Sequence, residues 1–332
     1  MKIAINGFGR IGRTVFRLLH ERAGVEVVGV NDITDNEALA YLLRHDTVMG
    51  HFNSKAVVEG DTLVTDKWNV KMTAERDPAA LPWKELGVDF VVEATGVFRD
   101  RASISKHLEA GARKVLLTVP AKDEIDATIV LGVNTGDLKA EHKIVSNASC
   151  TTNCLAPLAY VLDKEFGIEN GLMTTTHAYT GDQRLIDTPH SDWRRARAAA
   201  ENIIPTTTGA AKAVGKVLPN LNGKLDGMAM RVPTVCGSVV DLVTNMKTDV
   251  TVEAVNAALK KASETYLKGI LSYNDDAVVS SDIVGDPHSS IFDPGCTSVI
   301  DGRVLKTISW YDNEWGYSNR VCDLLQLMMD VG

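Results

Sequence analysis

The sequence has few cysteines, and none of them stand in a close pair. An odd number of cysteines with no C-x-x-C spacing gives neither a disulfide framework nor a zinc site. We therefore expect no metal ion and a reducing, cytoplasmic location. The five cysteines are Cys150, Cys154, Cys236, Cys296 and Cys322.

Long apolar runs are also missing. No stretch approaches the roughly 18 apolar residues that a membrane span requires. Met1 and Lys2 lead directly into a short apolar segment, without the charged region, long apolar region and cleavage site of a secretory leader. These absences predict a soluble cytosolic protein without a membrane partner.

An excess of basic residues is absent as well. The chain has 35 Lys and Arg against 43 Asp and Glu, a net charge of -8 and a pI near 5.5. A nucleic-acid groove needs a surplus of positive charge, so nucleic-acid binding is not expected as the main function.

The sequence contains no low-complexity segment, no Pro/Gly/Ser linker and no internal repeat. Its 332 residues exceed one typical hydrophobic core and suit two domains. Without a linker, the boundary between two domains is predicted to be tightly packed. We place it at the polar segment around Cys150.

That segment, Ser146–Cys154, joins a small polar loop to an apolar pattern of helical spacing. The pattern consists of Leu155, Leu158, Ala159, Leu162 and Phe166. Ser149 or Ser146 is a plausible N-cap, which puts Cys150 in or just before the first helical turn. Unpaired N–H groups and the positive dipole end favour a thiolate there, the form that attacks carbonyl carbons.

A buried cysteine of the core is the competing interpretation, because free cysteines are among the most buried residues. Polar neighbours favour the reactive interpretation for Cys150. Cys154 lies one turn deeper, gains less from the dipole and is predicted to be a core residue. Pro157 removes a helical hydrogen bond, so we expect a bend at that point.

The first residues carry a glycine pattern between a strand and a helix. Lys2–Asn6 is an apolar strand, Gly7, Gly9 and Gly12 follow, and a second strand ends before Asp32. This order and the spacing to Asp32 form a dinucleotide-binding fingerprint. The glycines allow backbone N–H groups to approach a pyrophosphate, and Asp32 accepts hydrogen bonds from a ribose.

The rest of the first half extends a parallel sheet. Residues 89–96 and 114–119 are nearly continuous apolar runs, as expected of strands covered on both faces. The segments 62–65 and 70–73 alternate and are predicted to form a local antiparallel addition. The fold class is thus α/β, with a Rossmann-type, mostly parallel sheet.

After Cys150 the strands are grouped. Residues 172–176, 224–232, 238–246 and 304–310 are strand-like, while Val255 to Tyr266 and the chain's last residues mark helix faces. Grouped strands with helices to one side predict an α+β domain with a largely antiparallel sheet.

Polar residues suited to thiolate chemistry follow the strand 172–176. His177 stands directly at its end, a position from which a side chain can project into a cleft. A lone histidine is more often structural, and a single arginine more often belongs to a solvated face. Arginines combined with Thr hydroxyls and a Gly backbone are nevertheless what phosphate groups require. These residues are Thr180, Arg194, Arg195, Arg197, Thr206, Thr207, Thr208, Gly209 and Arg231.

Over almost its whole length the sequence resembles the phosphorylating glyceraldehyde-3-phosphate dehydrogenases. The resemblance is carried by INGFGRIGR (5–13), VNDITD, EATGVF, SNASCTTNCLAP (146–157), THAYTGDQR, RRARAAAENIIPTTTGAAKAVGKVLP, GMAMRVPT and SWYDNEWGYSNRV (309–321). The cysteine motif and the motifs after it are specific to this family. The glycine fingerprint alone is not.

The resemblance implies an activity. D-glyceraldehyde 3-phosphate would be oxidised with NAD and inorganic phosphate to 1,3-bisphosphoglycerate through a thioester on Cys150, with His177 as the base. It also implies a homotetramer, with residues 180–202 against a neighbouring subunit. The implied domains are an NAD-binding domain of residues 1–149 with 313–332 and a catalytic domain of residues 150–312.

The resemblance assigns two sets of binding residues. Thr180 and Arg231 match those that hold the substrate phosphate, and those matching the inorganic-phosphate site are Ser149, Thr151, Arg195, Thr208 and Gly209. With the glycines, the positions matching NAD contacts are Arg10, Ile11, Asp32, Arg76, Thr118, Asn313 and Tyr317.

Thr188 stands where many NAD-specific members carry an apolar residue, so weak use of NADP is expected beside NAD. Two other functions stay open at this stage. One is an erythrose-4-phosphate dehydrogenase that hydrolyses its thioester. The other is a non-catalytic NAD-binding or RNA-binding module, which the joint presence of Cys150, His177, Arg195 and Arg231 argues against.

Overall fold

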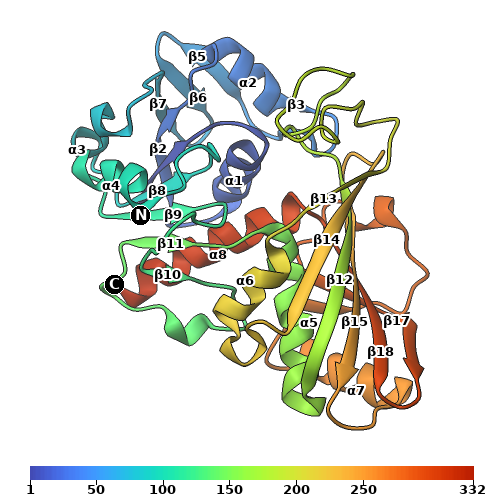
Figure 1. Ribbon diagram of the computed structural model, residues 1–332. Helices are drawn as coiled ribbons and strands as arrows, with labels where there is room; N and C mark the ends of the chain where they lie inside the picture. Colours follow the sequence, from blue (N-terminus) through green and yellow to red (C-terminus); the bar gives the residue numbers. More distant parts are fainter. The chain divides into compact units, whose positions relative to one another are not determined.

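The computed structural model describes residues 1–332, which form two compact units (Figure 1). The first unit contains residues 1–129, 136–148 and 318–332. The second contains residues 130–135 and 149–317. The chain returns to the first unit at Ser318, later than the Asn313 boundary expected from the sequence. None of the helices is both long and apolar enough to cross a membrane.

A nine-stranded sheet forms the centre of the first unit. Its order is β10-β11-β9-β8-β1-β2-β7-β6-β5, and only β6 runs antiparallel to its neighbours. Its strands are β1 (Lys2–Asn6), β2 (Glu26–Asn31), β5 (Ala56–Glu59), β6 (Thr62–Thr65), β7 (Asn69–Thr73), β8 (Phe90–Glu93), β9 (Lys114–Leu117), β10 (Ala127–Thr128) and β11 (Ile144–Ser146). A small separate pair consists of β3 (His45–Asp46) and β4 (Gly50–His51).

The predicted strands of this half are present. β6 and β7 form an antiparallel hairpin, and β7 pairs in parallel with β2. The hairpin is therefore an antiparallel addition to the main sheet beyond β2, as predicted. The alternation of Leu63, Val70 and Met72 indicated the strands but carries no information about which strand edge they join.

The helices of this unit are α1 (Arg10–Glu21), α2 (Asn36–Arg44), α3 (Trp83–Leu86), α4 (Arg101–Glu109) and the greater part of α8 (Trp315–Val331). It also contains a 3-10 turn at Pro78–Ala80. A second 3-10 turn, Thr135–Asp137, begins with the last residue of a segment of the second unit and continues in the first. Asp35 and Asp100 cap α2 and α4 by accepting from backbone N–H groups three residues on. The apolar stripe of α8 predicted from the sequence is fully buried.

The second unit is built on a seven-stranded sheet of order β13-β14-β12-β15-β18-β17-β16. Only the pairs β12/β14 and β16/β17 are parallel, so the predicted largely antiparallel sheet is confirmed. Its strands are β12 (Ile168–Ala178), β13 (Ile204–Thr207), β14 (Leu225–Val232), β15 (Ser238–Met246), β16 (Leu271–Tyr273), β17 (Ser290–Ile300) and β18 (Val304–Tyr311).

Helix α5 (Cys150–Phe166) packs on this sheet, against strands β12, β15, β17 and β18 (Figure 1). It continues through Pro157 without a break and ends at Gly167, which has a positive φ of 71°. The other helices of the unit are α6 (Ala210–Val217), α7 (Val252–Glu264) and the 3-10 turns Pro219–Leu221 and Ser280–Ile283. Met173, Thr175 and His177 form a buried face of β12, and the residues between them are more exposed.

Strand β17 is the longest element that the sequence did not predict. Its centre contains Asp293, Pro294, Gly295 and Cys296, and its pairing with β18 shifts register between Asp293 and Ser298. A bulge with Pro and Gly interrupts the alternation that marks a strand.

Candidate functional site

Cys150 is the first residue of α5. Ser149 caps the helix, its hydroxyl oxygen accepting from the Thr152 N–H at 3.1 Å. Ala148, just before the cap, has a φ of 56°, in the left-handed region that costs a non-glycine residue about 1–2 kcal/mol. This turn sends the chain from β11 into α5, so the backbone places Cys150 where the sequence predicted it.

His177 lies at the end of β12 with its Nε2 3.5 Å from Cys150 Sγ. Its Nδ1 lies 2.7 Å from the carbonyl oxygen of Ala178 and 3.0 Å from Arg231 Nη1. Because a carbonyl oxygen can only accept, the shorter contact places the proton on Nδ1, and Arg231 Nη1 donates to the same oxygen. Nε2 then presents its lone pair to the thiol. Burial, reinforced by the positive charge of Arg231, lowers the pKa of His177 to about 3, so the ring is neutral at pH 7.

The thiol of Cys150 differs from the expectation drawn from the helix start. Burial raises the pKa of Cys150, and the charge of Arg231 opposes it only in part. The helix dipole was the only influence visible in the sequence, whereas desolvation disfavours the charged form. The pair is therefore a thiol facing a neutral imidazole, and the proton moves when the thiol reacts.

Arg231 stands opposite His177 in the parallel register of β12 and β14. Its Nη1 lies 3.0 Å from the Ala178 oxygen and 3.4 Å from the Thr180 hydroxyl. Its Nε is buried without a hydrogen-bond partner. A half-buried guanidinium with a buried, unpaired donor beside a threonine hydroxyl is suited to bind an anion.

Arg195 belongs to a second group. It forms ion pairs with Asp182 and, through Nε at 3.5 Å, with Asp192, and the same Nε donates to the Thr206 hydroxyl at 2.9 Å. The sequence indicated the arginine but not that two carboxylates form ion pairs with it. Thr208 accepts from Ala210 N–H, and Gly209 is the N-cap of α6, with open space where a Cβ would stand.

Cys154 is confirmed as a core residue. It is fully buried, and its Sγ lies 3.6 Å from the Ser309 carbonyl oxygen and 3.7 Å from the Ser290 hydroxyl. Burial raises the pKa of its thiol to about 12, so it stays protonated and unreactive.

Two polar residues that contact the predicted site residues were themselves not predicted. Tyr311 is fully buried and its hydroxyl lies 2.8 Å from those of Thr151 and Thr175, so the Thr151 side chain points into the protein. Gln183 accepts from Thr180 N–H, and its amide nitrogen is buried without a partner. Gln183 could have been found from the sequence, because it lies within the family-specific motif of residues 176–184. For Tyr311 the sequence indicates only that it belongs to a strand.

The glycine loop of the first unit is shaped so that a ligand can approach its backbone closely. Gly7 has a φ of 92°, and a Cβ there would lie 2.6 Å from Thr95 N. A Cβ on Gly12 would lie 2.1 Å from the Gly7 oxygen, whereas one on Gly9 would meet no atom within 4 Å. No side chain caps α1. The loop thus leaves an open cradle at a helix N-terminus, which fits a pyrophosphate.

Beside this cradle lies a pocket of about 510 Å³ within the first unit. Asp32 lines it and accepts from Phe8 N–H at 2.7 Å and from Thr34 N–H at 3.0 Å. It therefore also fixes the glycine turn. The full lining is Asn6, Gly7, Gly9, Asn31, Asp32, Ile33, Glu75, Arg76, Ala94, Thr95, Val97 and Phe98.

The remaining predicted cofactor residues lie elsewhere. Arg10 forms an ion pair with Asp46, Ile11 is in the first turn of α1, and Thr118 follows β9, its hydroxyl donating to the Glu93 carbonyl oxygen. Asn313 and Tyr317 belong to the second unit. The Asn313 side-chain oxygen accepts from Gly237 N–H and the Ser238 hydroxyl, which directs its NH₂ group away from them.

Comparison with known proteins decides the family. A family model described as "Glyceraldehyde 3-phosphate dehydrogenase, NAD binding domain" matches residues 1–101, and "Glyceraldehyde 3-phosphate dehydrogenase, C-terminal domain" matches residues 149–313. The chain belongs to the glyceraldehyde 3-phosphate dehydrogenase family.

Curated relatives match almost end to end. Proteins named "Glyceraldehyde-3-phosphate dehydrogenase" from Borreliella burgdorferi and Mycobacterium tuberculosis are each 58% identical, over 336 and 335 residues. The alignments cover 99% of this chain and 100% and 98% of those proteins. "Glyceraldehyde-3-phosphate dehydrogenase 2" of Streptomyces avermitilis is 56% identical over 326 residues, covering 98% of this chain and 97% of that protein.

Membership of the glyceraldehyde 3-phosphate dehydrogenase family confirms the predicted resemblance and fold class. It also confirms NAD as the cofactor and an oxidoreductase of this type. The glycine cradle provides an independent structural fit to a dinucleotide.

Proposed function

We propose that this protein oxidises D-glyceraldehyde 3-phosphate to 1,3-bisphosphoglycerate, using NAD and inorganic phosphate, in glycolysis and gluconeogenesis. The observation that carries the proposal is the 3.5 Å contact between Cys150 Sγ and His177 Nε2, with Arg231 beside the histidine. The base and the anion-binding cation lie at the carboxyl ends of β12 and β14, and the nucleophile faces the base from the start of α5.

Cys150 acts as the nucleophile. As its Sγ forms a bond to the aldehyde carbon, the thiol proton passes to His177 Nε2, whose lone pair faces it. The proton then returns to the former carbonyl oxygen, which gives a hemithioacetal. Backbone N–H groups at the start of α5 stabilise the oxygen while it carries negative charge.

Oxidation needs a hydride acceptor, which NAD supplies when bound. His177 takes the hydroxyl proton of the hemithioacetal, leaving a thioester on Cys150. An oxygen of inorganic phosphate then attacks the thioester carbon, the C–S bond breaks, and the acyl phosphate leaves while Cys150 regains a proton. The thioester conserves energy that hydrolysis would lose.

Two phosphate sites follow from the two arginine groups. Arg231 and Thr180 hold the phosphate of the substrate, beside His177. Arg195, Thr208 and Gly209 hold the inorganic phosphate together with Ser149 and Thr151 at the start of α5. Because the Thr151 hydroxyl is turned toward Tyr311, Thr151 takes part through its backbone. Since Arg195 is paired with Asp182 and Asp192, the incoming phosphate exchanges with these carboxylates.

NAD is held by the glycine cradle and by Asp32 at the ribose, with Arg10, Ile11, Arg76 and Thr118 around them. Asn313 and Tyr317 are the further positions that we assign to NAD from the family resemblance. The domains proposed for these roles are residues 1–149 with 313–332 for the cofactor and residues 150–312 for catalysis.

A cytoplasmic homotetramer is proposed as the working form. Large apolar side chains of the second unit are exposed, among them Trp193 at 86%, Leu185 at 77% and Leu172 at 69%. Exposed apolar patches mark interfaces between proteins. Sedimentation velocity measures the assembly state.

Initial rates with and without inorganic phosphate test the function. With glyceraldehyde 3-phosphate and NAD, we expect turnover to require phosphate or arsenate. Turnover of erythrose 4-phosphate without phosphate would instead support a hydrolysing dehydrogenase. NAD binding without turnover of either aldehyde would support a non-catalytic module.

The two arginines are expected to give different kinetic defects. Arg231→Leu should raise KM for the aldehyde substrate by about 10- to 100-fold, since a charged hydrogen bond contributes about 1.5–3 kcal/mol. Arg195→Leu should mainly raise KM for inorganic phosphate. Steady-state kinetics with each ligand varied in turn measure both. If both variants affect the same ligand, the two-site assignment is wrong.

Asp32 is expected to set the cofactor preference. Its carboxylate would repel the 2′-phosphate of NADP. The neutral hydroxyl of Thr188 would attract that phosphate less strongly than the Asp32 carboxylate repels it. The parent should prefer NAD, with weak NADP activity. Asp32→Gly should raise kcat/KM for NADP and weaken NAD binding about tenfold or more, because the Phe8 N–H also loses its acceptor.

Asp35→Asn is the matched control for Asp32→Gly. It removes a carboxylate three positions away but keeps the helix cap on Ala38 N–H, so both cofactors should bind as in the parent. A parent enzyme with equal or higher kcat/KM for NADP would contradict the assignment of Asp32 to the ribose.

A further inference from the structure

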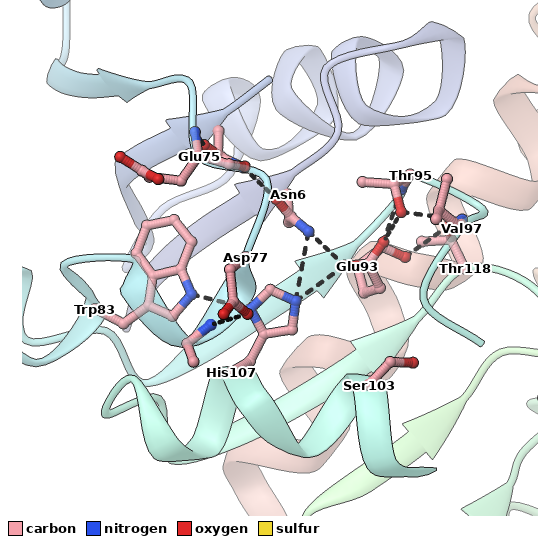
Figure 2. A network of polar contacts seen from close by, with 12 residues as sticks. Asn6, Glu75, Asp77, Trp83, Glu93, Thr95, Val97, Ser103, His107 and Thr118 are labelled. Carbon is pink, nitrogen blue, oxygen red and sulfur yellow. Dashed lines mark hydrogen bonds and ion pairs between the residues drawn. The ribbon is translucent and has the colours of Figure 1, made fainter. Parts of the chain in front are cut away.

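Glu93, the last residue of β8, is fully buried without a Lys or Arg partner. Its two carboxylate oxygens accept from three side chains and one backbone N–H, which belong to Asn6, Thr95 and His107. Figure 2 shows these groups around the carboxylate. Each hydrogen bond has a direction that a fixed donor determines.

The first fixed donor is the indole of Trp83. Its Nε1–H, which cannot accept, donates to His107 Nδ1 at 3.1 Å. Nδ1 is therefore unprotonated, and the ring proton is on Nε2, 2.9 Å from Glu93 Oε2. His107 lies between Trp83 and Glu93 as a neutral ring with one defined tautomer (Figure 2).

The second fixed donor is the backbone N–H of Glu75. It donates to Asn31 Oδ1 at 2.8 Å, so the Asn31 amide nitrogen faces Asn6 Oδ1 at 2.7 Å. The Asn6 amide nitrogen in turn donates to Glu93 Oε2 at 2.6 Å. Neither asparagine can be reversed without setting two like groups against each other.

The third fixed donor is the Thr95 backbone N–H, 2.8 Å from Glu93 Oε1, where the Thr95 hydroxyl also donates. Three hydrogen-bonded chains thus end at one residue, and none can reverse. Only a group that accepts at both oxygens satisfies them. A glutamine would turn its NH₂ group toward Thr95 N–H or toward Asn6 and His107, and in either orientation a donor faces a donor.

These hydrogen-bonded chains connect Glu93 to the pocket of about 510 Å³ that Asp32 lines. Asn6, Asn31, Glu75 and Thr95 line the pocket, whereas Glu93 does not. Its carbonyl oxygen also accepts from the Thr118 hydroxyl at 3.0 Å. We propose that Glu93, held by its hydrogen bond from His107, is a positioning residue for NAD. It fixes the ends of β1, β2 and β8 in the arrangement that the cofactor binds.

The inference rests on the proposed use of NAD and is tested with Glu93→Gln. Titration of NAD, followed by calorimetry or fluorescence, should show a dissociation constant at least about tenfold higher than that of the parent. At saturating NAD, kcat should stay within about threefold. Glu109→Gln makes the same chemical change on the exposed side of α4 and should bind NAD as the parent does.

A purely structural role predicts a different result. Glu93→Gln would then lower the melting temperature of the apo protein and leave the NAD dissociation constant unchanged, which overturns the inference. If the parent itself does not bind NAD, the proposed function fails instead. The two failures are therefore distinguishable.

The unmodified protein provides a second test that needs no folded variant. Nitrogen-15 NMR of the imidazoles should show His107 protonated on Nε2 only, with a ring N–H resonance that shifts when NAD is added. His142, whose ring accepts from Lys139 N–H, should not respond. A proton on His107 Nδ1, or a resonance unaffected by saturating NAD, would overturn the proposal.

Discussion

Replacing Cys150 by serine is expected to lower kcat/KM by at least about 10³-fold while the protein still folds and binds NAD. A hydroxyl is a weaker nucleophile than a thiol and is harder to deprotonate. The neutral His177 that suffices for the thiol does not compensate for this difference. Steady-state rates, together with an NAD titration and a melting curve, separate lost chemistry from lost structure.

Cys154→Ser is the matched control. The same sulfur-to-oxygen change is made one helical turn away, at a buried residue whose Sγ contacts Ser290 and Ser309. Activity should stay within about threefold of the parent, although burying a hydroxyl costs some stability. Equal losses of activity from both serine variants would show that the nucleophile is misassigned.

Replacing His177 by asparagine is expected to lower kcat by about 10²- to 10⁴-fold, the usual contribution of a positioned general base. Its Nε2 is the group in hydrogen-bond range of Cys150 Sγ, so alkylation of Cys150 near neutral pH should slow as well. Iodoacetamide inactivation rates measured from pH 6 to pH 10 provide the second measurement. Identical pH profiles in variant and parent would rule out the pairing.

His177 also predicts an effect on acid stability. Its pKa of about 3 in the folded protein lies below the ordinary 6.5, so the unfolded chain binds a proton first as the pH falls. Stability from the neutral ring is complete above pH 6.5 and decreases toward pH 3. At about pH 5 the parent should have lost roughly 2 kcal/mol relative to His177→Asn. Urea unfolding at several pH values measures this difference.

The parts of the molecule that depend on local sequence could be predicted. The glycines between β1 and α1, the cap at Ser149 and the position of Cys150 at a helix start each follow from a few neighbouring residues. Strand β15 was predicted with its observed bounds because its alternation is regular.

What the sequence could not provide depends on residues far apart in the chain. The pKa of Cys150 was misjudged because burial is a property of the fold, and the pairing of Arg195 with Asp182 arises from a loop conformation. The hydrogen-bond chains that end at Glu93 join β1, β2 and β8, so no local pattern reveals them.

The register of β12 and β14 constrains how this site can change. His177 and Arg231 face the same side because they are direct neighbours in a parallel pair. Sliding one strand by a single residue would turn one of the two away, and with it every buried side chain of that strand. The spacing of the His177 ring and the Arg231 guanidinium is therefore set by the strand pairing, whereas Thr180, Gln183 and Arg195 lie in the loop between β12 and β13 and can be replaced without shifting the sheet.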